Sequence, residues 1–137
     1  MTTALSHEAP ALSGVVHVLS APPREAPRLR GTLAEWELER AAALDDAGAR
    51  ARSIVSAALA RHGAAMLTGN APSLIDVGRW CRTCATVGDH GRPVVFDAAG
   101  MTMTNVHLST AAAGGLVVAA ASASGPVGID IEPEDGA

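Results

Sequence analysis

A helical stretch lies between β-type segments in this sequence, and this order most constrains the fold. Before it, residues 14–20 (GVVHVLS) form a β-branched run that ends in a Pro-Pro turn. After it come further runs of β-type composition, at residues 92–96, 103–109, 115–122 and 127–132. Helices inserted between a first strand and a later series of strands predict an α+β domain, with the helices packed on a small, mostly antiparallel sheet.

Two helices are expected within the central stretch. The first begins with Thr32 as N-cap, and Glu35 follows three residues later, as in a capping box. The second runs from about Ala49 to His62 and ends at Gly63, because glycine is common directly after a helix.

The composition predicts a core of small side chains. Of the 137 residues, 48% are hydrophobic but only 2% are aromatic, and much of the hydrophobic content is alanine. Close approach of the backbones must therefore replace the bulk of large side chains. The length suits one domain, for which we expect residues 14–132. Residues 1–13 lack periodicity and are expected to fray, and residues 133–137 form a tail.

The sequence argues against nucleic acid and membrane as partners. There are 10 basic and 14 acidic residues, a net charge of -4, and no basic stripe of the kind that binds nucleic acid. No segment has the pattern of a signal peptide or a membrane span, so a cytoplasmic protein without a membrane partner is expected.

Three arginines cluster in PPREAPRLR, namely Arg24, Arg28 and Arg30. They either are solvated around a Pro-rich turn or contact phosphate, which guanidinium geometry suits well.

Cys81 and Cys84 form a C-x-x-C motif in WCRTCATVGDHGRP. Without a secretory signal, a structural disulfide is not expected. Together with His90 the pair offers three zinc-type ligands, and His62 or His107 would supply the fourth. The alternative interpretation is a pair of reduced, partly buried thiols.

The stretch GPVGIDIEP (125–133) places two carboxylates in an otherwise apolar run. In an extended strand, Asp130 and Glu132 share one face, while Ile129 and Ile131 bury the other. Two such carboxylates form half of a divalent-cation site, and Mg²⁺ usually takes one or two of them and completes its shell with water and substrate phosphates. The alternative is an amphipathic edge strand with a solvated acidic face.

The order of these segments resembles the N-terminal half of the surfactin-type 4′-phosphopantetheinyl transferases. These enzymes use Mg²⁺ to move phosphopantetheine from coenzyme A to a serine of an acyl or peptidyl carrier protein. The matching stretches are ERAAAL (39–44), RARSIVSAALAR (50–61), CRTCATVGDHGRP (81–93) and GGLVVAAASASGPVGIDIE (114–132). The resemblance implies one of the two similar α+β halves of that fold, between which coenzyme A binds.

The resemblance also implies a ligand set. Asp130 and Glu132 would bind Mg²⁺, while Arg61 and Arg92 would contact the phosphates of coenzyme A. The basic loop that contains Arg24 and Arg28 would hold the far phosphate of the nucleotide.

Two departures from the family pattern bear on the reaction. The Ser-His-Ser box of the family aligns with Ala111, Ala112 and Ala113, and the methyl group of Ala112 neither binds phosphate nor carries a proton. The Glu-Lys helix of the second half has no counterpart, and the sequence contains no lysine. We therefore expect no transfer by this chain alone, but a need for a complementary C-terminal half subunit or for self-dimerisation. The alternatives are a non-catalytic pseudo-enzyme that binds a carrier protein or nucleotide, and a repurposed enzyme of secondary metabolism.

Overall fold

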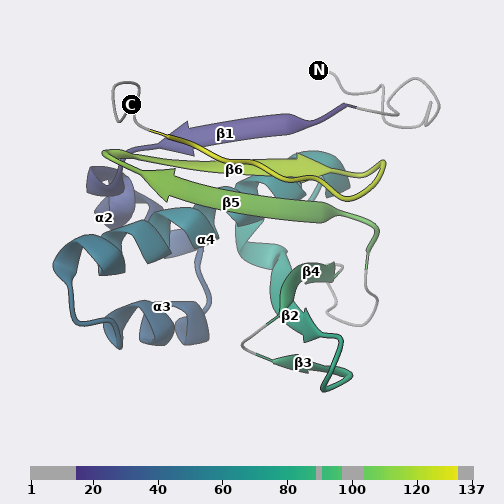
Figure 1. Cartoon of the computed structure of the whole chain (residues 1–137), viewed down its shortest axis with the longest axis horizontal. Coiled ribbons are helices and arrows are strands. Elements are labelled where there is room, and N and C mark those ends of the chain that lie inside the picture. The colour runs from purple at the N-terminus through teal and green to yellow at the C-terminus, as the bar shows by residue number, and fades with distance from the viewer. Residues whose placement is uncertain (1–14, 89–90, 97–103, 133–137) are drawn as a thin grey trace.

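The computed structural model describes residues 15–88, 91–96 and 104–132 (Figure 1). In this part of the chain there are two three-stranded antiparallel sheets. The first has the order β1–β6–β5, with β1 (His17–Ala21), β6 (Leu116–Ser122) and β5 (His107–Ala113). The second has the order β3–β2–β4, with β3 (Thr86–Gly88), β2 (Asp76–Cys81) and β4 (Arg92–Phe96). Residues 1–13 and 133–137, expected to be a frayed end and a tail, lie outside the described residues.

The helices gather on one face of the first sheet, and α4 is the longest of them (Figure 1). In chain order they are η2 (Pro23–Glu25), α2 (Ala26–Leu29), η3 (Arg30–Thr32), α3 (Glu35–Ala42), α4 (Ala47–Thr68) and η4 (Pro72–Leu74). Helix α4 packs on all three strands of the first sheet, and α3 packs on α4. None of the helices in the described part of the chain combines the length and the apolar character that a bilayer crossing needs.

The hydrophobic core follows α4 in two clusters. In the first cluster, Val55 and Leu59 of α4 pack against Val117 of β6. In the second, Ala64 of α4 packs among residues of both sheets, including Val95 of β4. The expected core of Ala, Val and Leu is confirmed, and residues of α4 lie in both clusters, while the two sheets also meet directly through β4 and β5.

Helix α3 begins later than the sequence predicts. Its N-cap is Ala34, and the Glu37 carboxylate accepts a hydrogen bond from the Ala34 N–H at 2.9 Å. Thr32 belongs to η3, where its hydroxyl donates to the Leu29 carbonyl at 3.0 Å. The predicted capping box of Thr32 and Glu35 is therefore wrong, because the chain makes a further 3-10 turn before the helix starts.

The predicted end of the second helix is also wrong. Helix α4 starts after Asp46, whose carboxylate accepts from the Ala49 N–H at 2.8 Å, and it ends at Gly69, whose φ is +76°. Gly63 is buried in the middle of the helix, where an added Cβ would lie 3.0 Å from the Cβ of Ala121 in β6. Its missing side chain lets α4 approach the sheet closely, so here glycine serves packing and not termination.

The strands confirm the α+β class with small antiparallel sheets. Strand β4 lies where it was predicted, and β1 and β6 lie close to their predicted runs. Strand β5 starts four residues later than its predicted run at 103, and β2 and β3 were not predicted. The predicted strand at 127–132 is wrong, because this segment forms no strand ladder. It runs back along the first sheet (Figure 1), and the Ile129 N–H donates to the Ser109 hydroxyl of β5 at 3.2 Å.

Candidate anion-binding site

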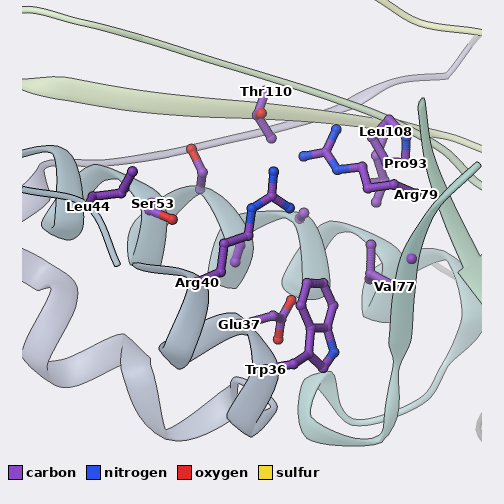
Figure 2. A pocket seen from close by; sticks show the side chains of 14 residues that line it. Trp36, Glu37, Arg40, Leu44, Ser53, Val77, Arg79, Pro93, Leu108 and Thr110 are labelled. Carbon is purple, nitrogen blue, oxygen red and sulfur yellow. The ribbon is translucent and has the colours of Figure 1, made fainter. Parts of the chain in front are cut away.

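A cavity of about 310 Å³ lies between the helices α3 and α4 and the strands β2, β4 and β5 (Figure 2). Helix α3 contributes Trp36 and Arg40, and α4 contributes Ser53. Strand β2 contributes Arg79, and β5 contributes Thr110. The wall therefore combines two cations with hydroxyl groups and one aromatic ring, which is a lining suited to an anionic ligand.

The two arginines of the cavity face each other. Figure 2 shows the guanidinium groups of Arg40 and Arg79 directed toward each other across the cavity. Burial lowers the pKa of Arg79 from its usual value, and the positive charge of Arg40 lowers it further. Arg79 donates one long hydrogen bond, of 3.4 Å, to the Gly91 carbonyl. Within residues 15–88, 91–96 and 104–132, no carboxylate forms an ion pair with either arginine.

The carboxylate that also lines the cavity, Glu37, is already paired. Its Oε1 accepts from Arg61 Nε at 2.8 Å, and the two side chains are only 6% and 2% exposed. The Nη1 atom of Arg61 donates to the carbonyls of Pro72 and Ile75. The ion pair ties α3 to α4, and the other hydrogen bonds of Arg61 tie α4 to the chain before β2. Glu37 forms no ion pair with Arg40 or Arg79 among the described residues.

The structure places Arg61 differently from the other arginines of the predicted ligand set. Its guanidinium is enclosed in the core, so a phosphate would have to displace Glu37 to reach it. Arg92 lines a second, open cleft of about 410 Å³, together with His107 of β5 and Val127 of the C-terminal segment. Arg24 and Arg28 are exposed in η2 and α2, outside both cavities, and Arg28 forms an ion pair with Glu25.

The predicted magnesium ligands Asp130 and Glu132 are exposed, whereas Ile129 and Ile131 are half-buried. Burial thus alternates as it does in an extended chain, although the segment forms no strand ladder. The Oδ1 atom of Asp130 accepts from the Ile131 N–H at 2.9 Å. In the described part of the chain, no three His, Cys, Asp or Glu side chains come together as a metal-binding group. The pair alone therefore offers at most two protein ligands.

Cys81 and Cys84 are brought together at the β2–β3 turn. The Cys84 N–H donates to Cys81 Sγ at 3.3 Å. A hydrogen bond with the Cys81 side chain raises the pKa of the Cys84 thiol, with a smaller contribution from burial. His90, the expected third ligand, lies outside the described residues. Neither His62 nor His107 joins the two cysteines in a group of three ligands within the described residues.

Sequence reasoning missed the two residues that define the cavity. Arg40 lies in the stretch expected to be helical, and Arg79 lies in a segment for which no strand was predicted but which forms β2, so neither arginine stood out as a candidate ligand. Their meeting depends on how α3 and β2 fold over α4, which local spacing does not encode.

The sequence matches no protein-family model, no curated protein and no solved structure.

Proposed function

We propose that this chain is a 4′-phosphopantetheinyl transferase-like half-domain, which binds coenzyme A and needs a second polypeptide for transfer to a carrier-protein serine. The observation that carries the proposal is the pair of guanidinium groups, from Arg40 and Arg79, that face one cavity. Two like charges held together repel each other, and a phosphate group between them replaces that repulsion with attraction. Guanidinium groups also offer paired N–H donors that match phosphate oxygens.

The volumes of the two cavities indicate how much of such a ligand they hold. The first, about 310 Å³, lies at the small end of the range of ligand sites, so it suits a phosphorylated end of the ligand. The second, about 410 Å³, shares Pro93 and Leu108 with the first and adds Arg92 and His107. The two cavities are thus neighbours, and the second reaches the C-terminal segment at Pro126 and Val127.

The acidic residues of that segment fit the metal that the reaction needs. Asp130 and Glu132 are exposed to solvent, and Mg²⁺ usually takes one or two carboxylates and completes its shell with water and phosphate oxygens. Phosphoryl transfer depends mainly on positioning and on neutralising the phosphate charges. The two carboxylates and the arginines together supply part of that apparatus.

An exposed apolar edge supports the need for a second polypeptide. Strand β1 is an edge strand of the first sheet. Val18 of this strand is 62% exposed, and Val16, just before it, is 42% exposed. An exposed edge strand offers unpaired backbone groups to another chain, and exposed apolar side chains beside it favour such pairing. A complementary half subunit, or a second copy of this chain, would cover it.

The test is calorimetric titration of the full chain with coenzyme A, with and without Mg²⁺. Arg40→Gln and Arg79→Gln should each lower the affinity about 10-fold or more, since each removes a charged hydrogen-bond donor. The matched control is Arg52→Gln, because Arg52 lies outside the cavity and makes only a 3.9 Å ion pair with Asp46. Absence of binding, or equal affinity in all three variants, would contradict the proposal.

The dependence on a second polypeptide has a separate test. The chain is incubated with coenzyme A, Mg²⁺ and an apo carrier protein, and the mass of the carrier protein is measured. We expect no mass increase with this chain alone and an increase when a polypeptide that carries the C-terminal half of a 4′-phosphopantetheinyl transferase is added. A mass increase with the chain alone would show that no second polypeptide is needed.

A non-catalytic binding module is the second candidate, and strand β5 favours it. The residues aligned with the Ser-His-Ser box are Ala111, Ala112 and Ala113 at the end of this strand, and their side chains offer no hydrogen-bonding group. Binding of coenzyme A without transfer, even when a complementary half is present, would support this candidate over the transferase.

A further inference from the structure

The β2–β3 hairpin carries a feature that the proposed function does not use. Cys81 is the last residue of β2 and pairs with Thr86 of β3, so residues 82–85 form a tight turn between the two strands. Cys84 lies within this turn and is exposed, while Cys81 is half-buried. Both sulfur atoms are therefore held at one end of a hairpin, and neither residue lines the anion-binding cavity.

The backbone of the turn is arranged around the sulfur atom of Cys81. The Cys84 N–H donates to Cys81 Sγ at 3.3 Å, and the Ala85 N–H donates to the Cys81 carbonyl at 2.8 Å. Ala85 has a φ of +56°, a value that is uncommon for residues other than glycine. Such backbone conformations persist where the surrounding structure enforces them, and they concentrate at binding sites.

The backbone presents an N–H donor to the sulfur atom of Cys81, whereas the hydrogen bond between the two side chains raises the pKa of Cys84, so Cys84 gives up its proton in exchange for a metal ion. A backbone N–H directed at a sulfur atom stabilises negative charge on it. The thiolate, and not the thiol, is the form that binds metal. Two cysteines separated by two residues also have the spacing found in structural zinc sites.

We propose that Cys81 and Cys84 together bind a thiophilic divalent cation such as Zn²⁺. On binding, two S–H bonds break, two metal–sulfur bonds form, and two protons are released to solvent. Zinc is four-coordinate in structural sites, so two positions remain beyond the two sulfur atoms. In the described part of the chain no further His, Cys, Asp or Glu completes a group of three with this pair. Water molecules therefore take these positions.

The first test is competition between the reduced full chain and a chromogenic zinc chelator. Cys81→Ser and Cys84→Ser should each weaken zinc binding by at least about 10-fold, as even indirect changes at metal sites cost about 10–100-fold. The matched controls are Thr83→Ala, in the same turn, and His107→Ala, in the second cleft, and both should bind zinc like the original chain. Equal affinity of all four variants, or no withdrawal of zinc from the chelator, would overturn the proposal.

A second measurement on the unaltered chain guards against variants that fail to fold. The rate at which the two cysteines are alkylated is followed by mass spectrometry, with and without Zn²⁺. We expect Zn²⁺ to slow alkylation of both cysteines together, and Mg²⁺ to have no effect because it prefers oxygen ligands. Alkylation at the same rate in Zn²⁺ as in its absence would also overturn the proposal.

Discussion

Replacing Glu37 with Gln should destabilise the protein strongly, because it leaves the charge of Arg61 buried without an anion. The two side chains meet at 2.8 Å and are only 6% and 2% exposed. Breaking a buried ion pair by removing one charge costs about 3–5 kcal/mol. Glutamine keeps the shape of the side chain and an oxygen that can accept from the Ala34 N–H, so the N-terminus of α3 stays capped. The substitution thus isolates the lost charge.

The loss is large compared with the expected stability of the domain. Single domains unfold with a free energy of about 5–15 kcal/mol, so a loss of about 3–5 kcal/mol in Glu37→Gln would remove roughly a fifth of it or more. Urea lowers the free energy of unfolding by about 1–3 kcal/mol per molar for a small protein. With a slope of about 2 kcal/mol per molar, the urea midpoint falls by roughly 1.5–2.5 M. The fluorescence of Trp36, which lies beside Glu37 in α3, can report the transition.

Two further variants test the reasoning. Arg28→Gln removes the exposed ion pair with Glu25, and it should cost at most about 1 kcal/mol, the usual contribution of a surface pair. The double variant Glu37→Gln/Arg61→Met should lose less stability than the sum of its two single changes, because it buries no unpaired charge. A loss below about 1 kcal/mol in Glu37→Gln alone would refute the idea that a buried ion pair connects α3 and α4.

Three other substitutions have outcomes that urea denaturation can check. Asp46→Ala removes the N-cap of α4 and should cost about 1 kcal/mol, and Asp46→Asn should restore most of it. Gly91→Ala should cost about 3 kcal/mol or more, because the new Cβ would lie 2.0 Å from the Trp80 carbonyl oxygen and φ is +101°; an unchanged midpoint would contradict this backbone geometry. Gly63→Val should cost about 1–3 kcal/mol by overpacking against Ala121, and a stabilised variant would show that α4 does not approach β6 this closely.

Local sequence patterns correctly predicted the residue types of the core and the α+β fold class, but they misplaced the ends of several helices and strands. Runs of β-branched residues located β4 and overlapped β1, β5 and β6, because the preference of a residue for a strand is a local property. Gly63 was interpreted as a helix end because local statistics favour glycine there. The close contact with Ala121 of β6 comes from a distant part of the chain, and no local window contains it.

The candidate site also depends on contacts between distant parts of the chain, which local sequence patterns do not predict. The alternation of Asp130 and Glu132 with isoleucines correctly predicted which side chains are exposed, since that depends only on an extended backbone. Whether the segment pairs as a strand depends on a neighbour, and the prediction of a strand was wrong. Arg40 and Arg79 belong to different elements, so their shared cavity follows from the packing of α3 and β2 and not from any motif.

The division of the molecule into two sheets on one helix has a consequence for hydrogen exchange. Proteins open in cooperative units, and a unit with fewer buried contacts opens more often. The sheet β3–β2–β4 meets the first sheet mainly through β4 and β5, while its other support comes from α4 and the helical turn before β2. Its amide protons should therefore exchange with deuterium sooner than those of β6. A ligand held by Arg40 of α3 and Arg79 of β2 would fasten this sheet to the helices, so deuterium uptake in β2 would measure how much of the cavity is occupied.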